Sequence, residues 1–200
     1  MIAPSAPWPA RCTLLVMLHL ACVLSYMDRV VMSVAIVAIG EEQGWDLSEQ
    51  GALLSAFFIG YIACMLPWGV LSDRIGAKPV LGWGLFAWSM LTIAMPLAVR
   101  FGYAATFAAR VLVGCFEAVT FPAVMHFQAR AIPLEERGRA LGAVFAGSYV
   151  GTVVGMGATP ILLSRWGWRL VFVYYGAVGL VWCVFFFYVG AATRRHMGGS

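Results

Sequence analysis

The chain has 200 residues, of which 62% are hydrophobic and 11% are charged. A soluble domain carries about 25% charged residues, so this composition excludes a water-soluble globular protein and favours one embedded in a lipid bilayer. The net charge of +4 is too small to indicate a nucleic-acid partner.

The hydrophobic runs are long enough for membrane-spanning helices, each of which needs about 20 mostly apolar residues. We expect a cytoplasmic tail over residues 1–11, a six-helix bundle over 12–191, and the start of a cytoplasmic loop or tail over 192–200. The expected spans are Cys12–Ile39, Gln50–Leu71, Val80–Val99, Tyr103–Phe127, Ala140–Leu163 and Leu170–Ala191. These runs are too long for the strands of a membrane barrel, and helices satisfy their own backbone in lipid. The sequence therefore predicts an all-α membrane protein.

Basic residues predict the orientation of the spans, because cytoplasmic loops carry an excess of Lys and Arg. One side of the membrane would receive eight such residues and the other side three. The eight are Arg11, Arg74, Lys78, Arg130, Arg137, Arg139, Arg194 and Arg195, and the three are Arg100, Arg165 and Arg169. This bias places both termini in the cytoplasm. It does not indicate which membrane holds the protein.

Four ionisable residues fall inside the expected spans: Asp28 and Arg29 in the first, and Arg110 and Glu117 in the fourth. Such groups are costly in lipid and usually face a bundle interior or a water-filled cavity. Arg110 and Glu117 are seven residues apart, so they share one helix face. We expect Arg29, Arg110 and Glu117 to line one polar cavity, with Asp28 at its edge.

These four residues suggest an anion site coupled to a cation. Arg29 and Arg110 offer permanently charged forks that suit phosphate or carboxylate. Glu117, and after it Asp28, could exchange a proton, because burial favours the neutral form of a carboxyl group. The structural alternative is that Arg110 pairs with Glu117, and Asp28 with Arg29, only to neutralise charge.

Other polar residues and glycines within the spans extend the candidate site. Four hydroxyl groups could contact a substrate, although each could also bond a backbone carbonyl: Tyr26, Tyr61, Ser148 and Tyr149. The turn after the second span contains the candidate gating residues Gly69, Asp73, Arg74, Gly76 and Lys78. In the fifth span Gly147, Gly151 and Gly155 form a stripe that lets helix backbones approach closely.

The five cysteines lie singly within apolar runs, so the sequence indicates neither a disulfide framework nor a zinc site. We expect them to be small apolar fillers. No set of nucleophile, base and orienting residue is visible, and GxSxG, GxxxxGK[ST] and HExxH are missing from the sequence. We therefore expect no enzymatic activity, no cofactor and no bound metal.

Several of these motifs resemble one family. The turn from Gly69 to Lys78, GVLSDRIGAK, is similar to the signature loop of the major facilitator superfamily. Four further stretches resemble the anion:cation symporter branch of that superfamily. They are Tyr26-Met-Asp28-Arg29, the run from Arg110 to Pro122, the run from Ile132 to Gly155, and Gly167-Trp-Arg. That branch includes plant and algal anion transporters and the relatives of sodium-phosphate and vesicular glutamate transporters. One departure is Trp68, which stands after Pro67 where many members have glycine.

The resemblance implies roles for individual residues. The arginine that matches Arg29 contacts the substrate anion, and the one that matches Arg110 supports the site. The acids that match Asp28 and Glu117 take part in proton coupling. A secondary transporter working by alternating access is implied, with phosphate or another inorganic or organic anion as substrate and protons or sodium as the coupling ion.

The family fold has twelve helices in two halves, and each half is an inverted three-plus-three repeat. This chain would supply the N-terminal half, so transport would need the missing C-terminal half or a homodimer partner. Three interpretations stay open: a truncated twelve-helix transporter, an incomplete gene, and a half-size protein. The alternative function is a non-transporting half that associates with a full transporter or serves as a membrane scaffold.

Overall fold

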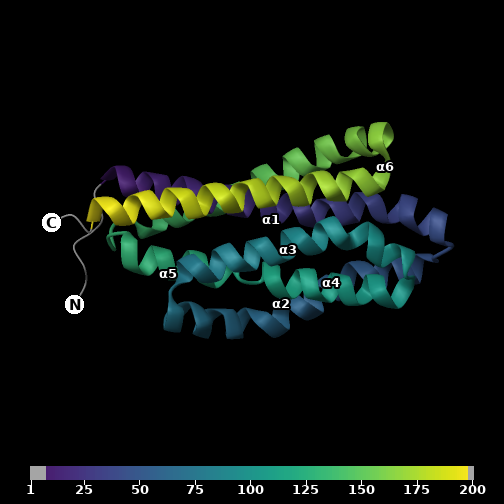
Figure 1. The fold of residues 1–200 in the computed structure, drawn as a ribbon, viewed down its shortest axis with the longest axis horizontal. Helices are drawn as coiled ribbons and strands as arrows, with labels where there is room; N and C mark the ends of the chain where they lie inside the picture. The colour runs from purple at the N-terminus through teal and green to yellow at the C-terminus, as the bar shows by residue number, and fades with distance from the viewer. Residues whose placement is uncertain (1–7, 198–200) are drawn as a thin grey trace.

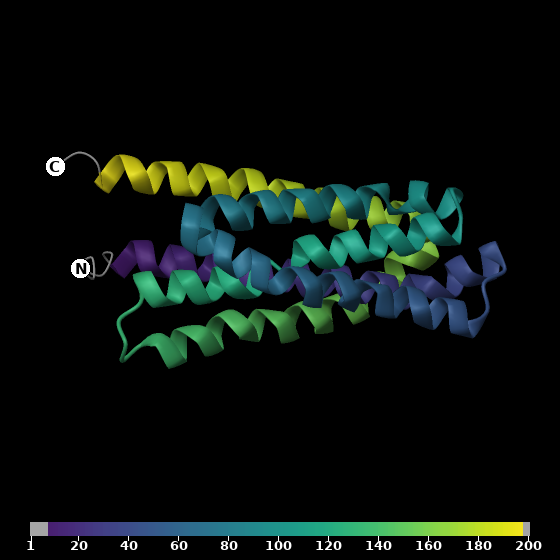
Figure 2. The ribbon, with the colours of Figure 1, turned by 90° about the horizontal axis from the view of Figure 1, so that it is seen from below.

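The computed structural model describes the backbone of residues 8–197 and the side chains of residues 11–188. This part of the chain is helical and contains no strand. Its helices are α1 Trp8–Gln43, α2 Leu47–Ile75, α3 Ala77–Arg100, α4 Tyr103–Glu117, α5 Thr120–Ala131 and α6 Arg137–Met197. They run lengthwise beside one another as an elongated bundle (Figures 1 and 2). The all-α prediction is confirmed, and the helices extend beyond the expected span ends at Cys12 and Ala191.

Five stretches of the described chain are long and apolar enough to cross a membrane: Arg11–Gln43, Leu47–Ile75, Ala77–Arg100, Tyr103–Ala131 and Arg137–Tyr188. The last of them contains the fifth expected span and most of the sixth. Gly167 interrupts it with φ 72° and ψ 161°, a conformation that glycine adopts without steric cost. The chain turns back there, so the two parts of α6 run in opposite directions (Figure 1).

The fourth expected span is divided into α4 and α5, with Ala118 and Val119 between them. Pro122 supplies the physical reason, because it has no N–H to donate to the carbonyl of Ala118, four residues earlier. The interruption directly follows Glu117. It therefore places the buried acid at the end of a helix segment rather than within a regular one.

The helix ends follow local sequence signals. Asp46 caps α2 because its side chain accepts a hydrogen bond from the backbone N–H of Glu49, and the Glu49 side chain accepts one from the backbone N–H of Asp46. Gly76 joins α2 to α3 with φ 90°. The first turn of α1, the α2–α3 turn, the α5–α6 loop and the last turn of α6 lie at one end of the bundle (Figures 1 and 2). The basic residues that predict the cytoplasmic side lie within these segments or within one or two helical turns of them.

Glycines determine which helices approach most closely. A Cβ atom at Gly147 or Gly151 of α6 would overlap a backbone carbonyl oxygen of α1. The expected small-residue stripe therefore packs α6 directly against α1. A second, unexpected pair joins α2 to α4: a Cβ atom at Gly60 would overlap the carbonyl oxygen of Val111, and one at Gly114 that of Phe57.

Two apolar clusters fill the bundle, one near each end. Along α1 the first includes Leu18 and Cys22, and the second begins at Val31. The segment between them carries Ser25 together with Asp28 and Arg29, two of the four ionisable residues that the sequence assigned to a polar cavity or its edge. The fold thus gathers these ionisable side chains at mid-length, between two apolar layers.

Candidate functional site

The site centres on an ion pair between α1 and the end of α4. Nε of Arg29 donates a hydrogen bond to Oε1 of Glu117 at 2.5 Å, and the hydroxyl of Ser25 donates to the same oxygen at 2.6 Å. Ser25 and Arg29 are four residues apart, which places them on the same face of α1. Oε2 of Glu117 is buried and has no hydrogen-bond partner among the described residues.

Three aromatic rings surround the guanidinium group of Arg29. Its Cζ atom lies 4.6 Å from the ring centroid of Tyr26, 4.9 Å from that of Phe57 and 4.8 Å from that of Tyr61. A cation over a ring face is attracted by the ring quadrupole, more strongly where water is excluded. The sequence singled out both tyrosines as possible substrate contacts. In the structure they border the arginine.

Arg110 and Asp28 flank this pair without forming the pairs of the structural alternative. Nε of Arg110 donates to the carbonyl oxygen of Leu53 at 3.4 Å, and the side chain is buried. Asp28 accepts a hydrogen bond from Thr92 of α3 at 2.9 Å and is 7% exposed. The ion pair of this site, Arg29–Glu117, therefore crosses between the two helices instead of linking neighbours on one helix. Asp28 faces α3, on a different side of α1 from Arg29.

The two members of the central pair differ in their accessibility. The Arg29 side chain keeps 21% of its surface exposed, whereas Glu117 has none. A solute that approached this face would therefore meet the guanidinium group first. Glu117 would respond through its hydrogen bonds to Arg29 and Ser25.

The two α6 residues of the candidate site are separate from the central pair. Ser148 is buried beside Cys22 of α1. Tyr149 is 78% exposed. The role of both residues in contacting a substrate stays a prediction. A site that included them would need residues from outside the described part of the chain.

The candidate gating turn contacts α5. Oδ1 of Asp73 lies 3.0 Å from Nδ1 of His126. A groove of about 500 Å³ lies between α2 and α5, and its lining includes Gly69, Asp73, Pro122 and His126. Arg74 is exposed and Lys78 is partly buried. The sequence alone did not indicate that His126 is the partner of Asp73.

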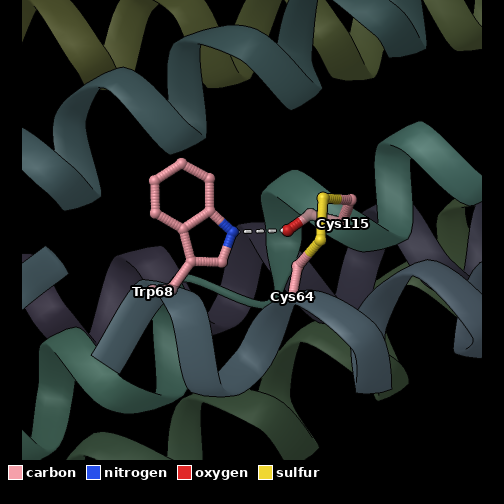
Figure 3. The surroundings of a disulfide bond; sticks show 3 residues. All are labelled: Cys64, Trp68 and Cys115. Carbon is pink, nitrogen blue, oxygen red and sulfur yellow. Dashed lines mark hydrogen bonds between the residues drawn. A yellow bond between two sulfur atoms is a disulfide. The ribbon is translucent and has the colours of Figure 1, made fainter. Parts of the chain in front are cut away.

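One expectation about the cysteines is wrong. Cys64 of α2 and Cys115 of α4 form a disulfide with Cα atoms 5.1 Å apart (Figure 3). Nε1 of Trp68 donates a hydrogen bond to the carbonyl oxygen of Cys115 at 2.6 Å, beside the bond. The physical reason is the close α2–α4 approach at Gly60 and Gly114, which brings together two cysteines that are 51 residues apart. The other three cysteines, Cys12, Cys22 and Cys183, are free.

Comparison with known sequences identifies the family. The Major Facilitator Superfamily profile matches residues 18–198, which is most of the chain. The chain belongs to the Major Facilitator Superfamily. Its relatives also agree with the anion:cation symporter branch that the motifs resemble.

Three of these superfamily relatives illustrate the branch. The chain is 38% identical over 181 residues to "Probable anion transporter 4, chloroplastic" of Oryza sativa subsp. japonica, covering 88% of the chain and 31% of the relative. It is 36% identical over 180 residues to "Sodium-dependent phosphate transport protein 1, chloroplastic" of Arabidopsis thaliana, covering 88% and 35%. It is 37% identical over 145 residues to sialin of Ovis aries, covering 72% and 29%. The chain spans about a third of the length of these relatives.

The fold is also similar to two solved structures of a bacterial transporter homologue. A bacterial homologue of the human lysosomal transporter Spinster, in its inward-facing and occupied conformation, superposes with a TM-score of 0.76 at 25% identity, covering 91% of this chain and 44% of that one. The unoccupied form gives a TM-score of 0.74 at 23% identity, covering 91% and 43%. Within the described residues, no group of three or more His, Cys, Asp or Glu side chains is placed to hold a metal ion. The superfamily assignment therefore describes a multi-pass membrane protein whose relatives are transporters.

Proposed function

We propose that this chain is the N-terminal half of an anion transporter that works by alternating access, with phosphate or a small organic anion as substrate. The observation that supports this most is the Arg29–Glu117 pair, in which the cation is partly exposed and the acid is fully buried. A guanidinium group whose Nε is already engaged can still present its two terminal nitrogens to an oxyanion.

Coupling to a proton would follow from the same pair. While Glu117 is ionised, it competes with the substrate for Arg29. Protonation of Glu117 removes that competition, so the anion and the proton would bind together and leave together. Ser25 would keep Glu117 oriented in both states through its hydroxyl group, which can donate or accept. Sodium is the alternative coupling ion, and one relative is named for sodium-dependent phosphate transport.

The proposed architecture has six membrane crossings arranged as a three-plus-three repeat, with the two parts of α6 on either side of Gly167 as the fifth and sixth. This chain forms one wall of the substrate cavity. The other wall would come from a C-terminal half or from a second copy of the chain. Both termini would lie in the cytoplasm, as the basic residues predict. Gly69, Asp73, Arg74, Gly76 and Lys78 would form the turn that rearranges during gating.

Anion uptake by the full-length protein in proteoliposomes tests this proposal. Radiolabelled phosphate and a panel of organic anions would be supplied, with the pH and sodium gradients varied separately. We expect gradient-dependent uptake that Arg29→Ala abolishes. Arg165→Ala is the matched control, because Arg165 is exposed and lies in α6 just before Gly167. Full uptake by Arg29→Ala would refute the site, and no uptake by the unaltered protein would favour the non-transporting alternative.

A further inference from the structure

Phe57 of α2 lies between Arg29, which is partly exposed, and Arg110, which is buried. Its ring centroid is 4.9 Å from Cζ of Arg29 on α1 and 5.2 Å from Cζ of Arg110 on α4. The side chain is 1% exposed. One aromatic ring therefore contacts both permanent positive charges of the site, although they come from different helices.

Such an arrangement opposes the repulsion between two like charges. In a medium of low dielectric constant, neighbouring guanidinium groups repel strongly. The face of an aromatic ring attracts a cation, by roughly 2 kcal/mol or more where the cation is desolvated. Phe57 can therefore hold both arginines near the site before an anion neutralises them.

The position of the ring is itself fixed. The backbone carbonyl of Phe57 lies against Gly114, where a Cβ atom would overlap it. The ring also stacks on Tyr61, with centroids 5.7 Å apart and planes at 29°. Tyr26 and Tyr61 contact Arg29, whereas among these rings only Phe57 contacts Arg110 as well.

We infer that Phe57 is a positioning residue of the anion site. It keeps the guanidinium groups of Arg29 and Arg110 on either side of its ring, so that both can bind the same oxyanion. This inference rests on the proposed function. Phosphate and carboxylate offer several directional acceptor oxygens, and phosphate has enough of them for both forks. A halide ion has no such oxygens, so the two guanidinium groups favour oxyanions over chloride.

The competing explanation is that Phe57 only packs α2 against α4. Packing depends on the volume of the ring, whereas positioning depends on its charge distribution. Stepwise fluorination weakens the negative face of the ring and changes its volume little. Fluorinated phenylalanines incorporated at position 57 therefore separate the two explanations, and Phe57→Leu removes the ring face entirely.

Kinetics of phosphate uptake in proteoliposomes by the full-length protein provide the test. We expect Phe57→Leu to raise KM for phosphate about 2- to 30-fold, the range equivalent to a loss of about 0.5–2 kcal/mol, with a smaller change in maximal rate. Progressive fluorination at position 57 should raise KM progressively. Chloride should compete with phosphate more effectively in these variants than in the unaltered protein.

Phe58 is the matched control, since it is 54% exposed and contacts the Phe57 ring edge-on, with centroids 5.3 Å apart. Phe58→Leu and fluorination at position 58 should leave KM unchanged. If fluorination at position 57 also left KM unchanged, or if Phe57→Leu lowered only the maximal rate, the positioning role would be overturned.

A measurement without transport separates failure of this inference from failure of the proposed function. If the unaltered protein takes up no anion, the proposed function fails. Thermal unfolding of the purified protein then still tests the contact through a double-mutant cycle of Phe57→Leu and Arg110→Leu. A double variant whose loss in Tm is smaller than the sum of the single losses supports the contact. Additive losses would overturn it.

Discussion

Arg29 and Glu117 are joined by a 2.5 Å hydrogen bond across α1 and α4, yet only Arg29 reaches the surface of the bundle. The negative charge of the fully buried Glu117 carboxylate is therefore compensated by one partly exposed cation and by the hydrogen bond from Ser25. Whatever binds Arg29 also changes the surroundings of Glu117. This dependence is the physical link by which an anion and a proton could be coupled.

Glu117→Gln should separate substrate binding from coupling. Glutamine keeps the shape of the side chain but has no charge and cannot take up a proton. We expect accumulation of phosphate driven by a pH gradient to fall at least about tenfold, while exchange of internal for external phosphate persists. Both activities would be measured in proteoliposomes over a series of pH values.

Asp28→Asn serves as the comparison, because Asp28 bonds Thr92 and does not pair with Arg29. A smaller loss of gradient-driven accumulation is expected from this variant. Unchanged pH-driven accumulation by Glu117→Gln would contradict the coupling role of Glu117. If Asp28→Asn alone removed it, the proton site would have to be moved to Asp28.

Gly114→Ala should destabilise the α2–α4 contact. The added methyl group would overlap the carbonyl oxygen of Phe57, which is backbone and cannot move without shifting a helix. Overpacking of this kind costs about 1–3 kcal/mol. We expect a lower Tm of the purified protein in detergent.

Gly157→Ala is the control, because its added Cβ would meet no atom within 4 Å beyond its chain neighbours and its own helix backbone. Alanine also favours a helix by about 1 kcal/mol over glycine. Equal Tm changes in both variants would argue against the close approach.

The Cys64–Cys115 disulfide should stabilise the same contact. Cross-linking residues that are 51 positions apart limits the unfolded chain, with a typical effect of about 2–4 kcal/mol. Cys64→Ala should therefore lower the Tm, and reductant should lower the Tm of the unaltered protein but not of this variant. Cys12→Ala is the control, because Cys12 is free.

Thiol labelling checks the disulfide directly. Of the five cysteines in the sequence, the denatured and unreduced protein should label three with a maleimide reagent. After reduction it should label five. Five labelled thiols before reduction would contradict the bond.

Much of the fold could be predicted from composition and the length of apolar runs, because lipid leaves a chain few ways to satisfy its backbone. The Gly147–Gly155 stripe could likewise be predicted, because its glycines recur every four residues along one helix. The disulfide and the close α2–α4 approach at Gly60 and Gly114 could not be predicted, because each depends on single residues of different helices. Their partners depend on helix rotation, which no local pattern specifies.

The candidate site shows the same limit. Burial cost alone indicated that Arg29, Arg110 and Glu117 belong together, but it did not determine which charge pairs with which. Seven-residue spacing placed Arg110 and Glu117 on one helix face and left an Arg110–Glu117 pair open as the structural alternative, whereas the structure joins Glu117 to Arg29. Phe57 was missed entirely, because an apolar ring in an apolar span gives no signal until its neighbours are known.

The Asp73–His126 contact should affect the rate of transport rather than the affinity for substrate. It joins α2 to α5 beside the groove, at the end of the bundle that holds the α2–α3 turn, and it is not part of the Arg29 site. We expect Asp73→Asn to lower the maximal rate of phosphate uptake several-fold with KM unchanged, because the proposed gating motion would rearrange the helices there. Glu135→Gln removes one exposed negative charge from the α5–α6 loop at the same end and should change neither value. Uptake kinetics of both variants at equal protein density provide the measurement. A raised KM in Asp73→Asn would contradict a role limited to the rate, and an equal effect in Glu135→Gln would show that Asp73 acts through general surface charge instead of through its contact with α5.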